Sequence, residues 1–138
     1  MDAVTLVRRA STGPWRRVDR GDQDIARLFA PLGALSHEVA TVAYLDGRRA
    51  LLGMRHMVGA TDWLELPIRD IIRDALALDA RKLVMAHNHP SGIAEPSRAD
   101  LAFTRRLVLC VEALDMRLID HFVIAGDRMT SLRESGFL

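Results

Sequence analysis

One stretch of the sequence, residues 82–100 (KLVMAHNHPSGIAEPSRAD), constrains the fold more than any other. It opens with a short apolar run, residues 82–86, which predicts a central buried strand. Two prolines and a glycine then predict a stiff loop, and Ser97 precedes a helix that we expect over residues 98–114. A strand whose carboxyl end leads through a loop into a helix is typical of α/β folds, which bind ligands beside such strand ends.

The rest of the chain supplies further strands and helices around this segment. An apolar run over residues 39–45, a turn at Asp46-Gly47 and a second run over residues 50–54 predict an antiparallel hairpin. Apolar residues at helical spacing predict an amphipathic helix over residues 67–78. Further elements are expected as a short helix near residues 24–31 and strands over residues 118–124 and 128–132. The predicted fold class is therefore α/β, with a mixed, mostly antiparallel sheet flanked by helices.

Length and composition indicate one domain with an aliphatic core. The chain has 138 residues, 49% of them hydrophobic and 5% aromatic, which suffices for one sizeable core but not for two domains. We expect a basic N-terminal arm and short helix over residues 1–35, followed by a single domain over residues 36–138. The pattern selects no oligomeric state.

Two absences in the sequence exclude classes of protein. No apolar run reaches the roughly 18 residues that a membrane span needs, and no signal-peptide-like segment begins the chain, which favours a cytoplasmic protein with no membrane contact. Cys110 is the only cysteine, so the chain can form no intramolecular disulfide and no cysteine-based zinc site. We expect Cys110 to be a small buried side chain of the second long helix.

The N-terminal arm is the one segment that suggests nucleic acid. The formal net charge of +1 argues against attraction to phosphate over the whole surface. The first twenty residues are nevertheless basic and include Trp15 together with Arg8, Arg9, Arg16, Arg17 and Arg20. This arm is either a solvated terminal segment or a weak nucleic-acid contact, with arginines on phosphates and the indole stacked on a base.

The histidines after the central strand suggest a metal site. His87 and His89 are two residues apart, so in an extended chain both imidazoles project to the same side. The stiff loop returns Asp100 toward them at the start of the following helix. Two nitrogens and one carboxylate oxygen form a catalytic type of zinc set, which leaves the fourth position for a water whose pKa the ion lowers to about 7. An iron site uses the same ligand types.

Two further residues complete a hydrolytic set. Glu38, just before the first predicted strand, is our candidate to accept a proton from the water and pass it to the leaving nitrogen. Ser97 is our candidate to donate a hydrogen bond to the oxyanion. Ser97 and Asp100 also have the spacing of a helix N-cap and its partner, and two histidines in a surface loop need not bind metal. Capping does not exclude catalysis.

The motif H-x-H, seven residues, S-x-x-D over residues 87–100 resembles that of the JAMM/MPN metalloproteases, and residues 36–138 resemble the C-terminal JAB domain of bacterial RadC proteins. The resemblance implies a JAB/MPN, cytidine-deaminase-like architecture and assigns residues to roles. The implied zinc ligands are His87, His89 and Asp100, the acid/base residue is Glu38 with Glu65 as an alternative, and the oxyanion residue is Ser97. The resemblance to the RadC domain also includes Asp120-His121, for which we expect a buried structural role.

The resemblance implies a zinc metallopeptidase or isopeptidase that acts on an extended peptide. RadC proteins carry a DNA-associated helical region before this domain, and here a short basic arm stands in that place. A DNA-associated accessory domain of the RadC type with a structural metal is therefore an alternative hypothesis. A nuclease or another metal-dependent hydrolase is a third, because an activated water does not by itself select an amide bond.

Overall fold

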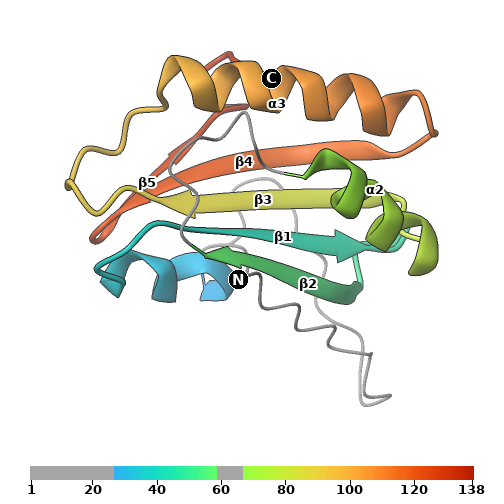
Figure 1. Ribbon diagram of the computed structural model, residues 1–138, viewed down its shortest axis with the longest axis horizontal. Helices are drawn as coiled ribbons and strands as arrows, with labels where there is room; N and C mark the ends of the chain where they lie inside the picture. Colours follow the sequence, from blue (N-terminus) through green and yellow to red (C-terminus); the bar gives the residue numbers. More distant parts are fainter. Residues whose placement is uncertain (1–26, 59–66) are drawn as a thin grey trace.

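The computed structural model describes residues 27–58 and 67–138 (Figure 1). Within these residues one sheet of five strands has the order β2-β1-β3-β4-β5. The pair β3–β4 is parallel, and the pairs β1–β2, β1–β3 and β4–β5 are antiparallel. The strands are β1 (Val39–Leu45), β2 (Leu51–Val58), β3 (Lys82–Asn88), β4 (Arg117–Ala125) and β5 (Arg128–Ser131). The predicted α/β class with a mixed, mostly antiparallel sheet is confirmed.

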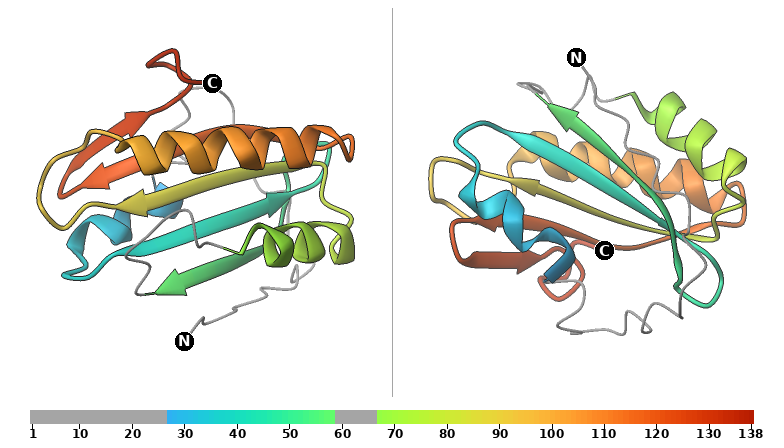
Figure 2. Two further views of the ribbon diagram at one scale, coloured as in Figure 1. Left: turned by 45° about the horizontal axis from the view of Figure 1, so that its top comes forward. Right: turned by 90° about the horizontal axis from the view of Figure 1, so that it is seen from below.

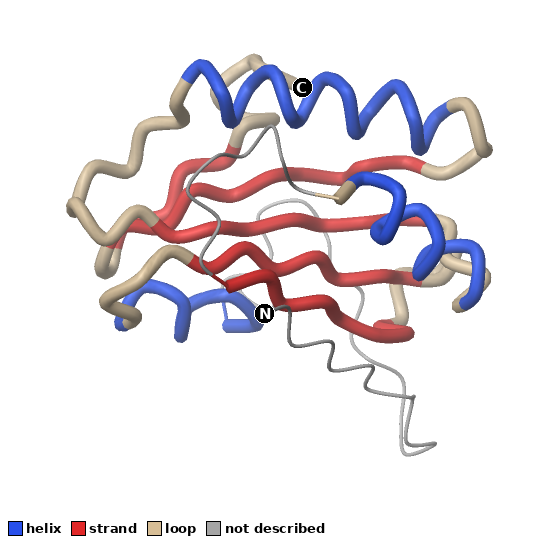
Figure 3. The backbone as a smooth tube through the Cα atoms, in the orientation of Figure 1, coloured by secondary structure: helices blue, strands red, loops and turns tan. Residues whose placement is uncertain are grey.

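Helical segments cover both faces of this sheet (Figures 2 and 3). On one face lie α2 (Ile68–Ala77) and α3 (Arg98–Glu112). On the other face residues 27–29 are helical and continue into the 3₁₀ helix η1 (Ala30–Ala34). A separate apolar cluster fills each interface: Leu83 and Met85 belong to the cluster beneath α2 and α3, whereas Val84 and Ala86 belong to the one beneath η1. Alternation along β3 thus divides its residues between two cores.

The predicted hairpin is present as β1 and β2, and β2 is longer than predicted. β1 has the predicted bounds, and it pairs antiparallel with β2 as expected. β2 continues to Val58, four residues beyond the predicted end, and Arg55 lies within it. Its guanidinium is buried and bonded to the carboxylate of Asp74 on α2, from Nε to Oδ2 at 2.5 Å and from Nη2 to Oδ1 at 2.9 Å.

The buried ion pair between Arg55 and Asp74 also includes Tyr44 of β1, whose hydroxyl donates to Asp74 Oδ2 at 2.8 Å. Burial alone would raise the pKa of Asp74, but the hydrogen bonds from Arg55 and Tyr44 outweigh it and lower that pKa. Burial and the neighbouring carboxylate raise the pKa of Tyr44. The three side chains therefore tie β1, β2 and α2 together as one satisfied polar group inside an apolar layer.

Helix α3 ends earlier than predicted, and one of its residues lies elsewhere than expected. Phe103, Leu107 and Val111 form its buried stripe, as the spacing predicts. Cys110 is exposed, so its expected burial is wrong: it lies next to Val111 but on the solvent side of the helix. Leu114, expected on the inner stripe, follows the helix and is 43% exposed.

Several predictions concern residues outside the described part of the chain. The basic arm with Trp15, and Glu65 in its loop, fall within residues 1–26 and 59–66. The division of the chain at residue 36 stays a prediction. None of the helices in the described part combines the length and apolar character needed to cross a bilayer.

Candidate metal centre

The candidate site lies at the sheet edge where β1 begins and β3 ends (Figure 1). His87 is the penultimate residue of β3, and its neighbour across the sheet is Ala40 of β1. Glu38 lies two residues before Ala40, and alternation places its side chain on the same face as His87. Asp100 arrives on this face from the first turn of α3. The start of β1, the end of β3 and the first turn of α3 therefore bring the predicted ligands and the predicted acid/base glutamate to one place.

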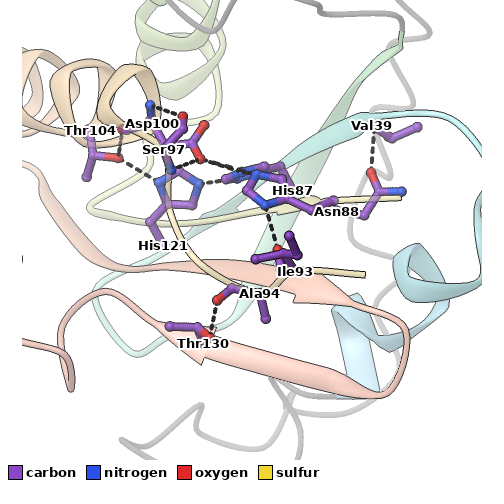
Figure 4. A network of polar contacts seen from close by, with 11 residues as sticks. Val39, His87, Asn88, Ile93, Ala94, Ser97, Asp100, Thr104, His121 and Thr130 are labelled. Carbon is purple, nitrogen blue, oxygen red and sulfur yellow. Dashed lines mark hydrogen bonds and ion pairs between the residues drawn. The ribbon is translucent and has the colours of Figure 1, made fainter. Parts of the chain in front are cut away.

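His87, His89 and Asp100 converge closely (Figure 4). Asp100 Oδ2 lies 3.2 Å from Nε2 of each histidine, and the two Nε2 atoms lie 2.9 Å apart. Ligand atoms about 2.0–2.1 Å from a tetrahedral zinc ion lie about 3.3–3.4 Å from one another. The three donor atoms therefore have nearly the spacing of one face of a zinc coordination tetrahedron.

A chain of hydrogen bonds sets the tautomer of His87. Thr104 donates its hydroxyl proton to the Asp100 carbonyl at 2.7 Å, so its oxygen must accept from His121 Nδ1 at 2.6 Å. Burial lowers the pKa of His121 well below its ordinary value, so this imidazole is neutral and its Nε2 carries a lone pair. That lone pair accepts from His87 Nδ1 at 2.7 Å. We therefore assign the lone pair of a neutral His87 to Nε2, the atom that faces Asp100.

His89 is oriented in the same sense by the loop that follows it. Its Nδ1 lies 2.9 Å from the Ile93 carbonyl, which can only accept, so Nδ1 carries the proton and Nε2 the lone pair of the neutral ring. Two imidazole lone pairs and the carboxylate of Asp100 thus point at one small volume. Such a group of acceptors is suited to bind a cation, and the partners of both Nδ1 atoms orient the rings as outer-shell partners orient metal-ligating histidines.

The electrostatics of the site favour positive charge. The interaction with Asp100 raises the pKa of His89. Burial would raise the pKa of Asp100, but the interactions with the imidazoles of His87 and His89 outweigh it and hold that pKa far below its ordinary value. Asp100 is fully buried, and among the described residues its Oδ1 is a buried oxygen without a hydrogen-bond partner. An orphaned carboxylate oxygen beside two imidazole lone pairs fits a metal site.

The residues missed by the sequence analysis are those that hold the ligands in place. Thr104 was not selected, and no spacing rule marks it, because its partner His121 comes from a strand 17 residues later. His121 was expected to be structural, and it is 1% exposed and contacts a predicted ligand directly. The only sequence signal that could have pointed to Thr104 is that it follows the motif aspartate by one helical turn.

Ser97 is the N-cap of α3 and forms a capping box with Asp100. Its hydroxyl oxygen accepts from the Asp100 N–H at 3.0 Å, and its own N–H donates to Asp100 Oδ2 at 2.7 Å. The capping interpretation is therefore correct as geometry. The serine hydroxyl acts there as an acceptor, and no other bond of this hydroxyl occurs among the described residues, so its proton remains available to a further acceptor.

Glu38 completes the group. Its carboxylate, together with one nitrogen each of His87 and His89, forms a group of three atoms that all lie within 4.8 Å of one another. The glutamate is only partly buried. His89 is partly buried as well, whereas His87 and Asp100 are fully buried. The arrangement therefore offers three converging donors for an ion and, beside them, a partly buried carboxylate.

The loop between β3 and α3 is itself held to the sheet. Thr130 of β5 donates its hydroxyl to the Ala94 carbonyl at 2.5 Å, one residue after the carbonyl that orients His89. Gly92 adopts a positive φ of 87°, where the turn after His89 closes. These contacts fix the imidazole of His89 from the side opposite Asp100.

Comparison with known proteins shows the family of the domain. The family model described as the RadC-like JAB domain matches residues 20–137. A UPF0758 protein of Acidithiobacillus ferrooxidans is 42% identical over 137 residues, which cover 96% of this chain and 61% of that protein. A UPF0758 protein of Marinobacter nauticus is 38% identical over 140 residues, which cover 99% of this chain and 62% of that protein. The chain thus spans about three fifths of the length of these curated relatives. On the family model and on these relatives, the chain belongs to the RadC-like JAB domain family.

Proposed function

We propose that this domain is a zinc-dependent hydrolase of the JAMM type, a metallopeptidase or isopeptidase. The observation that carries the proposal is the convergence of the Nε2 atoms of His87 and His89 and the buried Asp100 carboxylate within 3.2 Å of one another. His87, His89 and Asp100 would hold the ion. When bound, zinc supplies Lewis acidity and an acidified water at neutral pH.

The side chains around these donors can perform the remaining steps. Glu38 lies on the accessible side of the donor group, where its carboxylate can accept a proton from the attacking water and return it to the leaving nitrogen. Ser97 can turn its hydroxyl proton toward a developing oxyanion while its oxygen continues to cap α3. The chain of Thr104, His121 and His87 keeps the donor nitrogen of His87 unprotonated.

The choice of an amide substrate rests on membership of the JAB family. The partner we propose is an extended peptide or an isopeptide-linked tail that places its scissile carbonyl between Glu38 and Ser97. Glu38 precedes β1 and Ser97 caps α3, so both residues lie just outside the strands of the sheet. We propose that the substrate binds beside them in an extended conformation.

Metal analysis tests the first part of the proposal. We expect purified protein to contain about one zinc ion per chain by inductively coupled plasma mass spectrometry, and His87→Ala and Asp100→Ala to lose it. His56→Ala is the matched control, because His56 is a partly buried histidine on β2 that bonds Thr41 and not the site. Zinc that is absent from the wild type, or equally retained in all variants, would refute the proposal.

Hydrolysis tests the second part. Glu38→Gln removes the proton acceptor but keeps the size of the side chain, so it should retain zinc and lose about 10²–10⁴-fold in turnover. The measurement is cleavage of a mixture of internally quenched peptides of randomised sequence, with and without an isopeptide link. A zinc-loaded Glu38→Gln variant that cleaves as fast as wild type would exclude Glu38 from the reaction.

A second function has one observation in its favour, the five arginines among the first twenty residues. We propose as the alternative that the domain is a DNA-associated accessory module whose metal is structural. Binding to a labelled duplex, followed by fluorescence anisotropy, should then weaken steeply with added salt and again in an Arg16→Ala/Arg17→Ala variant. A flat salt response would count against it.

A further inference from the structure

Asn88, the residue between the two histidines, has a side chain that faces away from the metal centre. It lies on the η1 face of β3, it is 1% exposed, and all its polar atoms are bonded to main chain. Its Oδ1 accepts the Val39 N–H at 2.6 Å, and its Nδ2 donates to the His37 carbonyl at 2.9 Å and to the Leu35 carbonyl at 3.4 Å. Figure 4 shows the side chain of Asn88 extended toward Val39.

The positions of these three main-chain groups are informative. The His37 carbonyl belongs to the peptide group before Glu38, and the Val39 N–H belongs to the peptide group after it. One carboxamide therefore holds both peptide groups that flank the α-carbon of Glu38. Because a carboxamide presents a donor and an acceptor side by side, it can satisfy a carbonyl and an N–H together, whereas an ionised carboxylate only accepts and cannot bond the carbonyl.

We propose that Asn88 is a positioning residue for Glu38, and thus couples the strand end that carries both histidines to the carboxylate that acts beside them. This inference rests on the proposed function. Without the carboxamide, the segment before β1 loses its hydrogen bonds to the Asn88 side chain of β3. The carboxylate of Glu38 can then move relative to Nε2 of His87 and His89. A displacement of about 1 Å of a reacting group can cost about a hundredfold in rate.

The test compares Asn88→Ala with Thr41→Val on the full chain. Thr41→Val is the matched control, because it removes a buried hydroxyl from β1 on the same face of the sheet. Asn88→Ala should keep its zinc and its KM for the quenched peptides while kcat falls by about 10- to 100-fold. Exchange of the Val39 amide proton, measured by NMR, should accelerate by about tenfold in Asn88→Ala and stay unchanged in Thr41→Val.

A double-variant cycle separates positioning from a general structural role. If Asn88 acts through Glu38, then Asn88→Ala has no further effect on kcat in a Glu38→Gln background. A loss of zinc in Asn88→Ala, or an equal loss of kcat in both backgrounds, would overturn the inference. If Asn88→Ala does not fold, Asn88→Ser is measured in the same way.

The two proposals fail separately. If the wild type holds no zinc and cleaves none of the peptides, the proposed function fails, and the exchange rate of Val39 still decides whether Asn88 holds this segment. If the wild type cleaves peptides but Asn88→Ala matches Thr41→Val in kcat and in Val39 exchange, the positioning role fails while the hydrolase stands.

Discussion

Replacing Thr104 by valine removes one hydroxyl group from α3 with little change of volume, at a residue that is 2% exposed. Two hydrogen bonds are lost, one to the Asp100 carbonyl at 2.7 Å and one from His121 Nδ1 at 2.6 Å. The Nδ1–H group of His121 is then a donor without an acceptor in a fully buried ring. Moving that proton to Nε2 would bring it against the Nδ1 proton of His87, so His87 would have to move its own proton to the nitrogen that faces Asp100.

The expected loss depends on whether His121 keeps its Nδ1 proton without an acceptor or both imidazoles change tautomer. A stranded buried donor costs about 1–3 kcal/mol in the free energy of unfolding. The alternative tautomer keeps the hydrogen bond between the imidazoles but places a proton where the ion must bind. Loss of an outer partner of a ligating histidine typically lowers metal affinity by about 10–100-fold. We therefore expect Thr104→Val to lose about tenfold or more in zinc affinity and about 2 kcal/mol in stability.

The assay is competition for zinc against a chromophoric chelator, with urea unfolding of the same preparations. Thr41→Val provides a chemically matched control, because Thr41 Oγ1 also bonds an imidazole Nδ1, that of His56, at 2.8 Å on the opposite face of the sheet. It should lose stability and keep its zinc affinity. If both variants bind zinc as tightly as wild type, the hydrogen-bond chain does not set the tautomer of His87, and our assignment is wrong.

Three further predictions concern the scaffold. Asp74→Asn should be less stable than wild type at pH 6, and because the folded pKa of Asp74 is lowered, the difference measured by urea unfolding should shrink as the pH falls below about 4. Gly33→Ala should cost about 1–3 kcal/mol, since its Cβ would collide with the Gly126 carbonyl, whereas Gly47→Ala meets no neighbour and should leave the melting temperature nearly unchanged. Phe103→Ala should destabilise the domain by about 3–5 kcal/mol by calorimetry, because the ring is fully buried beneath α3.

Periodicity predicted most of the fold because the buried stripes of this chain are long and mainly aliphatic. The strand over residues 39–45 and the helices around Ile71 and Phe103 follow directly from the spacing of apolar residues. The end of β2 could not be predicted in the same way. The apolar run stops at Met54, and the burial of Arg55 in the strand depends on its pairing with Asp74 of α2, which is tertiary information.

The position of His121 illustrates another limit. Leu118 and His121 are three residues apart, so a regular strand would place them on opposite faces of the sheet. The register between β3 and β4 shifts by one residue after Leu83, so Leu118 lies opposite Leu83 and His121 lies opposite Met85. This bulge at Ile119 turns the imidazole toward α3. Nothing in the local sequence marks it, and so the partner of His87 was not predicted.

The candidate site was predicted to the extent that its residues form a compact motif. His87, His89, Ser97 and Asp100 lie within one segment of the chain, where local geometry brings them together. Glu38 lies just before β1, far from this segment in sequence, and was selected by its distance along the chain from the histidines. Its place beside them depends on the antiparallel pairing of Ala40 with His87, which the sequence suggested only through the family resemblance.

The three converging lone pairs have a consequence for the folding equilibrium of the domain. Folding brings the three side chains within 3.2 Å of one another, whereas the unfolded chain lets them separate, so a cation that needs all three binds only the native state. Such a cation adds about 2.7 kcal/mol to the stability when its free concentration is a hundred times its Kd. The thermal midpoint should thus report the free zinc concentration, and chelation should increase the population of unfolded chains before it affects any catalytic rate.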